Sequence, residues 1–279
     1  MFVVDAHFHL PPNVTDDDLK LLADSGEVAK IWLLSLPTFT HWGLDAGNDD
    51  RILKVSEKFP GFLVPFGFLD LTRPASVVDE LKARGFVGLK AHTPPKPYGD
   101  ESYFEHYARA EALRMPVVFH CGHFWQFPEG GLAVEGGYVP TWNTSLYTLD
   151  LIAKRFPGLT IIGAHLGWPY FQEAMALALT HSNVYFDVSL PLHMVIQAAK
   201  EAIIEKDIGT KLLFGTDLFL LRVPVRKVIE RAIFWRQYLE AIFGLELGGT
   251  PLAEAGRQIV ELVMGRTAER ILSGAASSG

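Results

Sequence analysis

Short apolar runs alternate with amphipathic stretches along almost the whole chain. The apolar runs show little polar alternation, which is typical of parallel strands covered on both faces. We expect strands at residues 2–9, 29–36, 62–68, 86–91, 116–120, 159–164, 183–188 and 211–216. The stretches between them predict helices near 15–25, 47–59, 74–84, 101–113, 144–155, 169–180, 192–206 and 224–243, and a last helical piece near 251–272.

Eight strands, each followed by a helix, predict an α/β fold of the (β/α)8 TIM-barrel type, which needs about 250 residues. The chain has 279 residues and no evident linker, so we expect one domain over 1–279 with a flexible Ser/Gly-rich tail at 273–279. A doubly wound open sheet is the alternative. It usually has fewer strands, and no Gly-x-Gly-x-x-Gly follows the first predicted strand.

Several predicted strands end in residues that commonly bind metals. His7 and His9 are alternate residues of the first strand, so their imidazoles share a face about 7 Å apart. Later apolar runs end at His120, His165 and Asp217. The C-terminal ends of barrel strands surround one opening, so we expect these five side chains to meet there. Nitrogen and carboxylate ligands without thiolate suit Zn²⁺, with Mn²⁺, Fe²⁺ or Co²⁺ as alternatives.

Composition narrows the class of protein. With 49% apolar residues and a net charge of -7, the chain can bury a large core and lacks the basic balance of a nucleic-acid-binding protein. No apolar span is long enough to cross a membrane, and the N-terminus lacks a signal-peptide pattern, so we expect a cytoplasmic protein with no membrane partner. Cys121 is the only cysteine, which excludes an intramolecular disulfide, and we expect it to be a small buried residue.

The ordered set of motifs resembles the amidohydrolase superfamily. More narrowly, it is similar to the amidohydrolase 2 branch, which includes the aminocarboxymuconate-semialdehyde and resorcylate-type decarboxylases. The resemblance covers nearly the whole chain and rests on 4–9 (VDAHFH), 47–49 (GND), 59–62 (FPGF), 85–90 (GFVGLK), 116–122 (PVVFHCG), 163–167 (GAHLG) and 214–217 (FGTD). The closing segment 265–272 is similar to the family's terminal helix, but Thr267 stands where the family usually has Asn.

This resemblance implies that His7, His9, His120 and Asp217 hold one divalent metal. It also implies that His165 stays off the metal and orients a water or polarises the substrate, so His165 and Asp217 are the expected catalytic residues. The chemistry of these side chains agrees, because a metal can lower the pKa of bound water to about 7. Asp217 can accept the water's proton, and His165 can accept a proton or stabilise an oxyanion.

Lys90 ends the fourth predicted strand and admits two roles. In binuclear relatives a lysine at this place is carboxylated and bridges two metals, so a second metal held with His120 and His165 is an alternative. In the decarboxylase-like branch a lysine is common here without bridging. We expect one metal, with Lys90 charged and bound to a substrate carboxylate.

Two long connections follow predicted strands, at 37–46 and 121–143, and both are rich in aromatic residues. In a barrel they lie on the catalytic face, where they form either a wall or lid over the substrate or self-packed surface loops. His92 shares a strand face with Lys90, although it equally fits a plain loop residue before Pro94. The further candidate substrate contacts are His41, His92, His123 and Trp125.

The same ligand set serves two reactions on a small-molecule substrate. We place first a metal-dependent hydrolase of a small carboxylate, lactone, ester or amide, and second a non-oxidative decarboxylase of an aromatic or diene carboxylate. A metal-free aldolase using Lys90 as a Schiff base would leave the histidines unexplained. A barrel without catalytic activity would leave the complete ligand set unexplained. Related proteins are often homodimers, and by analogy we expect the same here.

Overall fold

The computed structural model describes most of the chain. The described residues are 1–36, 47–122, 133–134, 137–138, 140–190, 192–205, 208–217, 224–247, 249 and 253–274. The structural statements below concern these residues.

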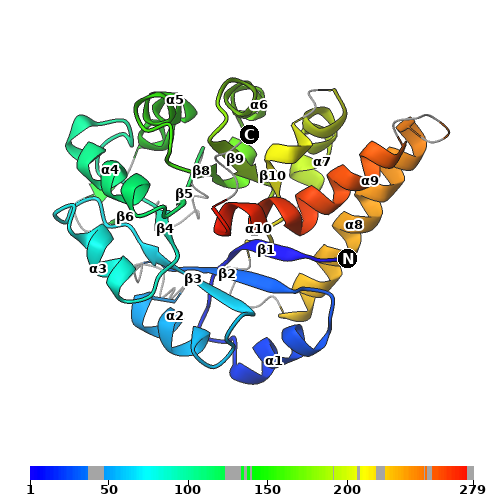
Figure 1. Cartoon of the computed structure of the whole chain (residues 1–279), viewed down its shortest axis with the longest axis horizontal. Coiled ribbons are helices and arrows are strands. Elements are labelled where there is room, and N and C mark those ends of the chain that lie inside the picture. The colour runs from blue at the N-terminus through cyan, green and yellow to red at the C-terminus, as the bar shows by residue number, and fades with distance from the viewer. Residues whose placement is uncertain are drawn as a thin grey trace.

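Eight parallel strands form one sheet in the order β1-β2-β3-β4-β5-β8-β9-β10 (Figure 1). Each lies inside the run predicted for it, so the expected strand pattern is confirmed. The strands are β1 (Val4–Phe8), β2 (Lys30–Leu34), β3 (Leu63–Phe68), β4 (Gly88–Ala91), β5 (Val117–Phe119), β8 (Ile161–Gly163), β9 (Val184–Asp187) and β10 (Leu212–Leu213). A separate antiparallel pair is formed by β6 (Ala133–Val134) and β7 (Gly137–Tyr138).

Backbone hydrogen bonds bring the first and last strands together. The residue after β10, Phe214, accepts a bond of 2.9 Å from the Ala6 amide in β1. Further on, the Asp217 amide donates to the His7 carbonyl over 2.7 Å. The sheet is therefore a nearly closed barrel, and the predicted TIM-barrel class is confirmed.

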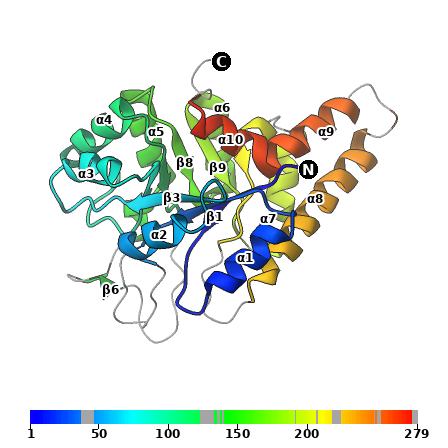
Figure 2. The ribbon, with the colours of Figure 1, turned by 60° about the horizontal axis from the view of Figure 1, so that its bottom comes forward.

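Helices follow the strands and surround the barrel, with α8 and α9 side by side at one flank (Figures 1 and 2). The α-helices are α1 (Asp16–Asp24), α2 (Asp49–Ser56), α3 (Val77–Ala83), α4 (Phe104–Ala112), α5 (Leu146–Arg155), α6 (Phe171–Thr180), α7 (Leu192–Lys200), α8 (Arg226–Leu247), α9 (Ala253–Glu261) and α10 (Thr267–Leu272). Short 3₁₀ turns are η1 (Glu101–Tyr103), η2 (Thr141–Thr144), η3 (Ala164–Gly167) and η5 (Gly209–Lys211), and single π-turns are η4 (Glu201–Glu205) and η6 (Leu262–Arg266).

The start of α1 shows how local sequence sets these boundaries. Thr15 caps the helix by accepting from the Asp18 amide, and the Asp18 carboxylate accepts from the Thr15 amide over 2.9 Å. This reciprocal capping box satisfies amides that have no partner inside the helix. Three aspartates fill the first turn, where negative charge suits the helix dipole.

Two apolar clusters form the core. The larger lies between the strands and the surrounding helices, and the smaller one fills the barrel interior. In the interior, Trp32 stacks on Phe66 with ring centroids 4.7 Å apart. Ala268 and Ile271 of α10 belong to the same cluster, so this helix plugs one end of the barrel (Figure 1). The other end is left for the polar side chains at the strand C-termini.

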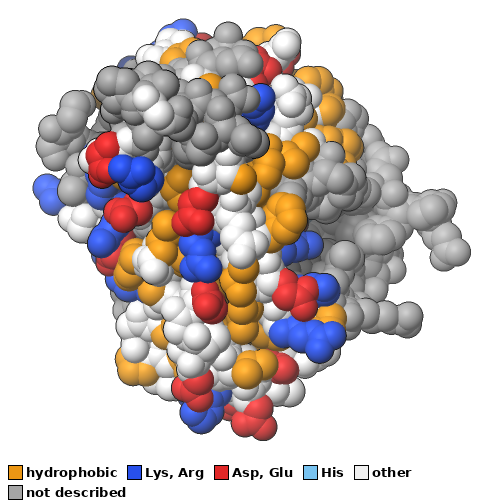
Figure 3. Space-filling model, turned by 90° about the vertical axis from the view of Figure 1, so that its right-hand side faces the viewer, with side chains coloured by type: hydrophobic (Ala, Val, Ile, Leu, Met, Phe, Trp, Pro, Cys, Tyr) orange, Lys and Arg blue, Asp and Glu red, His pale blue; other side chains and the backbone are white. Residues whose placement is uncertain are grey.

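The surface is mixed in character. Acidic, basic and apolar side chains are interspersed on the side of the molecule shown in Figure 3. Among the described helices, none is both long enough and apolar enough to span a lipid bilayer.

We expect Trp32→Ala to lower the free energy of unfolding by about 3–5 kcal/mol, since it leaves a cavity in the barrel interior. Urea unfolding followed by circular dichroism measures this change. The matched control is Trp142→Ala, because that side chain is 63% exposed and its loss should change stability by less than about 0.5 kcal/mol. Equal effects of the two substitutions would contradict the assignment of Trp32 to the core.

Candidate metal centre and active site

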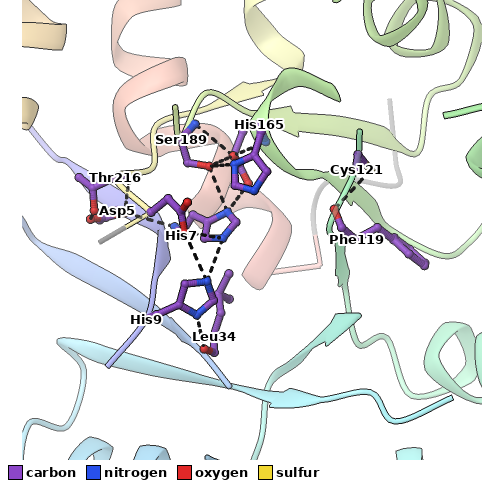
Figure 4. Close-up of polar contacts among 11 residues, drawn as sticks. Asp5, His7, His9, Leu34, Phe119, Cys121, His165, Ser189 and Thr216 are labelled. Atoms are coloured by element: carbon purple, nitrogen blue, oxygen red, sulfur yellow. Dashed lines mark hydrogen bonds and ion pairs between the residues drawn. The ribbon is translucent and has the colours of Figure 1, made fainter. Parts of the chain in front are cut away.

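Five histidines lie close together at the C-terminal ends of the strands. His7 and His9 belong to the end of β1, and their ring centroids are 5.2 Å apart. His165 lies 5.0 Å from His7 and 5.0 Å from His120, measured between ring centroids. The remaining histidine, His92, lies 4.5 Å from His120. The barrel thus brings together residues separated by more than 150 positions in the sequence, and Figure 4 shows part of this cluster.

Three ligand atoms meet at the separations that a single ion requires. His7 Nε2 and His9 Nε2 are 3.3 Å apart, and Asp217 Oδ1 lies 3.5 Å from the first and 3.4 Å from the second. Two ligands bound at about 2.0–2.1 Å to one tetrahedral ion lie about 3.3–3.4 Å apart. These three side chains therefore fit a common divalent metal without moving.

The Nδ1 atoms of His7 and His9 make hydrogen bonds that orient both rings, so that each Nε2 atom faces Asp217 Oδ1. His9 Nδ1 lies 2.8 Å from the Leu34 carbonyl, and His7 Nδ1 lies 2.8 Å from Asp187 Oδ2. Both partners are acceptors, so each Nδ1 carries the hydrogen and each Nε2 keeps its lone pair. Burial lowers the pKa of both histidines well below 6.5, so both are neutral. Burial raises the pKa of the Asp217 carboxyl to about 7, and a bound cation would favour its ionised form beside the two nitrogen lone pairs.

The backbone around Asp217 is held by several hydrogen bonds. Asp217 itself has φ of 47°, a strained value for a residue with a side chain. The Asp5 carboxylate accepts from the Thr216 amide over 2.9 Å and from the Thr216 hydroxyl over 2.5 Å. On the opposite side the Arg231 guanidinium donates to the Thr216 carbonyl. These contacts, with the bond to the His7 carbonyl, direct Asp217 toward the two histidines.

His165 is not a member of this three-atom group, but it forms a second set of possible ligand atoms with His7 and Asp187, all within 4.8 Å of one another. It follows β8 with φ of 61°, and its amide donates to Asp187 Oδ1 over 2.9 Å. Its Nδ1 lies 2.9 Å from the Ser189 hydroxyl (Figure 4). Burial lowers the pKa of His165 to about 3, so the ring is neutral at neutral pH. A role next to the metal agrees with this placement.

His120 is buried at 7% exposure and lies between His92 and His165 by ring contact. Among the described residues, two groups of three have ligand atoms that all lie within 4.8 Å of one another, His7–His9–Asp217 and His7–His165–Asp187, and His120 belongs to neither. The assignment of His120 as the fourth ligand stays a prediction.

Lys90 lies in β4 and is fully buried. Among the described residues, its ammonium nitrogen has no hydrogen-bond partner. Burial lowers the pKa of Lys90 to about 8, and the charges of Asp187 and Asp217 oppose that shift. A buried amine with unused hydrogens is suited to receive an anionic group.

Asp187 and Ser189 are polar residues of this site that sequence reasoning missed. Asp187 ends β9, and its carboxylate contacts both His7 and His165. The available signal was the strand predicted at 183–188, whose apolar run ends in an acidic residue as the last strand does. The predicted contacts His41, His123 and Trp125 lie outside the described residues, as does nearly all of the 121–143 connection.

Cys121 is buried at 1% exposure, and its thiol donates to the Phe119 carbonyl over 3.3 Å (Figure 4). Burial raises the pKa of this thiol to about 12. It is therefore neither a ligand nor a nucleophile at neutral pH.

A family model described as amidohydrolase, of the amidohydrolase 2 type, matches residues 42–273. The chain belongs to the amidohydrolase 2 family. This confirms the resemblance inferred from the motifs and makes the protein a member of a family of metal-dependent enzymes. His7 and His9 precede the matched range, so their place in the site rests on the geometry given above.

Solved structures with the same fold cover nearly the whole amidohydrolase chain. A probable 2-pyrone-4,6-dicarboxylic acid hydrolase from Acinetobacter baumannii, with citric acid bound, is 16% identical with a TM-score of 0.64, covering 98% of this chain and 100% of that one. The 2,6-dihydroxybenzoate decarboxylase from Rhizobium is 18% identical with a TM-score of 0.63, covering 98% and 99%.

A dihydroxybenzoic acid decarboxylase from Polaromonas, with bound manganese and 2-nitroresorcinol, is 15% identical with a TM-score of 0.62, covering 98% of this chain and 97% of that one. At these identities the likeness shows the fold. A search of curated protein sequences gives no match.

We expect His7→Ala to lose metal and activity together, because it removes one of the three converging atoms. His165→Ala should keep the metal while kcat falls by about 10²–10⁴, as expected when an acid–base group is removed. Metal analysis of each purified variant, beside its kcat, measures both effects. An empty site in His165→Ala would instead identify His165 as a ligand.

Proposed function

We propose that this amidohydrolase is a metal-dependent hydrolase of a small carboxylate-bearing lactone, ester or amide. One divalent ion, Zn²⁺ first and Mn²⁺ or Fe²⁺ as alternatives, would be held by His7, His9, His120 and Asp217. The observation that carries the proposal is the meeting of His7 Nε2, His9 Nε2 and Asp217 Oδ1 at 3.3–3.5 Å. When bound, such an ion acidifies water and polarises a carbonyl.

The protein's own side chains supply the remaining parts of a hydrolysis. Asp217 offers a second carboxylate oxygen to accept a proton from the attacking water, and its side chain is 29% exposed toward the opening. Neutral His165 accepts a proton and, once charged, stabilises negative charge on the reacting carbonyl oxygen. His165 is only 6% exposed, which limits its contact with bulk water and strengthens its electrostatic interactions.

Lys90 supplies a binding site for the substrate's carboxylate. With a pKa of about 8 the amine is mostly protonated at pH 7. Since its ammonium group is fully buried, a carboxylate bound there restores hydrogen bonds that the amine otherwise lacks. His92, beside His120, and the predicted contacts His123 and Trp125 would complete the substrate-binding surface.

A decarboxylase is the second candidate. Two observations favour it: two of the solved structures described above are decarboxylases, and the charge of the buried Lys90, which would hold the carboxylate, acts on His165, which would transfer the proton. In that reaction His165 would protonate the substrate carbon as CO₂ leaves. The two candidates share their residues and differ in the bond that breaks.

A panel of lactones and hydroxybenzoates separates these reactions. We expect acid to form from a lactone carboxylate without CO₂ release, followed by pH-stat titration and CO₂ detection in parallel. Chelation should remove the activity, and added Zn²⁺ or Mn²⁺ should restore it. Stoichiometric CO₂ from a hydroxybenzoate, with no lactone opened, would select the decarboxylase. Full activity in metal-free protein would contradict both.

Lys90→Met tests the carboxylate site. We expect KM to rise about 10- to 100-fold with a smaller change in kcat, since a hydrogen bond to a charged group contributes about 1.5–3 kcal/mol. Steady-state kinetics on the best substrate of the panel measure the split. Lys154→Met is the matched control, because that lysine is 62% exposed on α5 and should leave both constants unchanged. An unchanged KM in Lys90→Met would contradict the proposed carboxylate contact.

A further inference from the structure

Asp187 is a fully buried carboxylate that the reaction above does not use. Its Oδ2 lies 2.8 Å from His7 Nδ1. Its Oδ1 accepts from the backbone amides of His165 and Ser189, over 2.9 and 3.1 Å, and also from the Ser189 hydroxyl. One carboxylate therefore contacts a candidate metal ligand and the candidate acid–base residue.

Ser189 connects the ring of His165 to the same carboxylate. The serine hydroxyl has one hydrogen and donates it to Asp187 Oδ1. Its oxygen is therefore the acceptor for His165 Nδ1 at 2.9 Å. Figure 4 shows Ser189 next to both His165 and His7. The Nδ1 atom of each histidine is thus connected to Asp187 by hydrogen bonds. The bond is direct for His7 and passes through the Ser189 hydroxyl for His165.

We infer that Asp187 is a positioning residue that sets the tautomer of both histidines. A neutral imidazole carries one ring hydrogen, and holding it on Nδ1 leaves the Nε2 lone pair available. For His7 that lone pair is the one that would bind the metal. For His165 it is the one that would accept a proton, and this second half rests on the proposed function.

Asp187→Asn distinguishes this role from a merely structural one. The amide oxygen of the variant can still accept from the His165 and Ser189 amides, so the turn keeps its hydrogen bonds. Its NH₂ group, however, faces His7 Nδ1 and donates where the carboxylate accepted. The His7 hydrogen then favours Nε2, so a metal can bind there only after the hydrogen has moved back to Nδ1 against the amide.

Titration with Zn²⁺ in competition with a chromophoric chelator measures the consequence without any substrate. We expect Asp187→Asn to bind Zn²⁺ about 10- to 100-fold more weakly than the native protein, as is usual when a partner of a ligating histidine is changed. The matched control is Asp150→Asn. The Asp150 carboxylate also contacts a histidine, His181 Nε2 at 2.7 Å, but this pair lies outside the site. The control should bind Zn²⁺ normally. Unchanged Zn²⁺ affinity in Asp187→Asn would overturn the inference.

Long-range ¹H–¹⁵N spectra of the metal-free protein read the tautomers directly. We expect the Nδ1–H form for His7 and His165, and the Nε2–H form for His7 in Asp187→Asn. The Nε2–H form for His7 in the native protein would overturn the inference. These two measurements stay decisive even if no substrate of the proposed class is turned over, so failure of the proposed function is recognised separately.

Ser189→Ala isolates the His165 half. It removes the hydroxyl, which also lies 3.2 Å from His7 Nδ1, but it leaves the shorter 2.8 Å bond between Asp187 and His7, so Zn²⁺ affinity should stay within about twofold of the native value. We expect kcat to fall about 10- to 100-fold with KM unchanged, because the His165 ring loses its fixed tautomer. A native kcat, or a loss of Zn²⁺ affinity equal to that of Asp187→Asn, would overturn this half of the inference.

Discussion

The site depends on two hydrogen bonds that join the first strand to the segment after the last. The Ala6 amide binds the Phe214 carbonyl, and the His7 carbonyl binds the Asp217 amide. Because the second bond uses the backbone of His7, whose ring also faces Asp217, the contacts that close the barrel also bring together the three candidate ligand atoms. The Asp5 carboxylate strengthens the same junction by holding Thr216 from the β1 side.

Burial gives these polar groups their chemical character. Desolvation keeps the histidines neutral and so leaves their lone pairs available, and it brings the pKa of Lys90 close to the physiological range. Burying such groups costs free energy unless each has a partner. Here the partners are largely other members of the cluster or the ligands that the site would bind. Hydrogen bonds to these partners offset the free energy lost on burial. The backbone of His165 and Asp217 is in the left-handed region, which also costs free energy, and both residues belong to the candidate site.

Much of the fold was predictable because short, bounded apolar runs alternate with longer amphipathic stretches along the chain. The candidate ligands were predictable because each one ends or follows a predicted strand. The C-terminal ends of barrel strands lie on one face, so these residues were expected to lie close together. Asp187 was not found, since its importance comes from contacts with His7 and His165, which are 180 and 22 residues away. The last strand was predicted over 211–216, but only Leu212–Leu213 pairs with β9, because the chain then turns toward β1.

The plug formed by α10 has a consequence for how the chain acquires its structure. Ala268 and Ile271 fill the barrel interior opposite the site, and α10 contacts both β1 and β10. During synthesis the earlier strands leave the ribosome first, with their inner apolar faces uncovered. The interior cluster is complete only once residues 267–272 have packed into it.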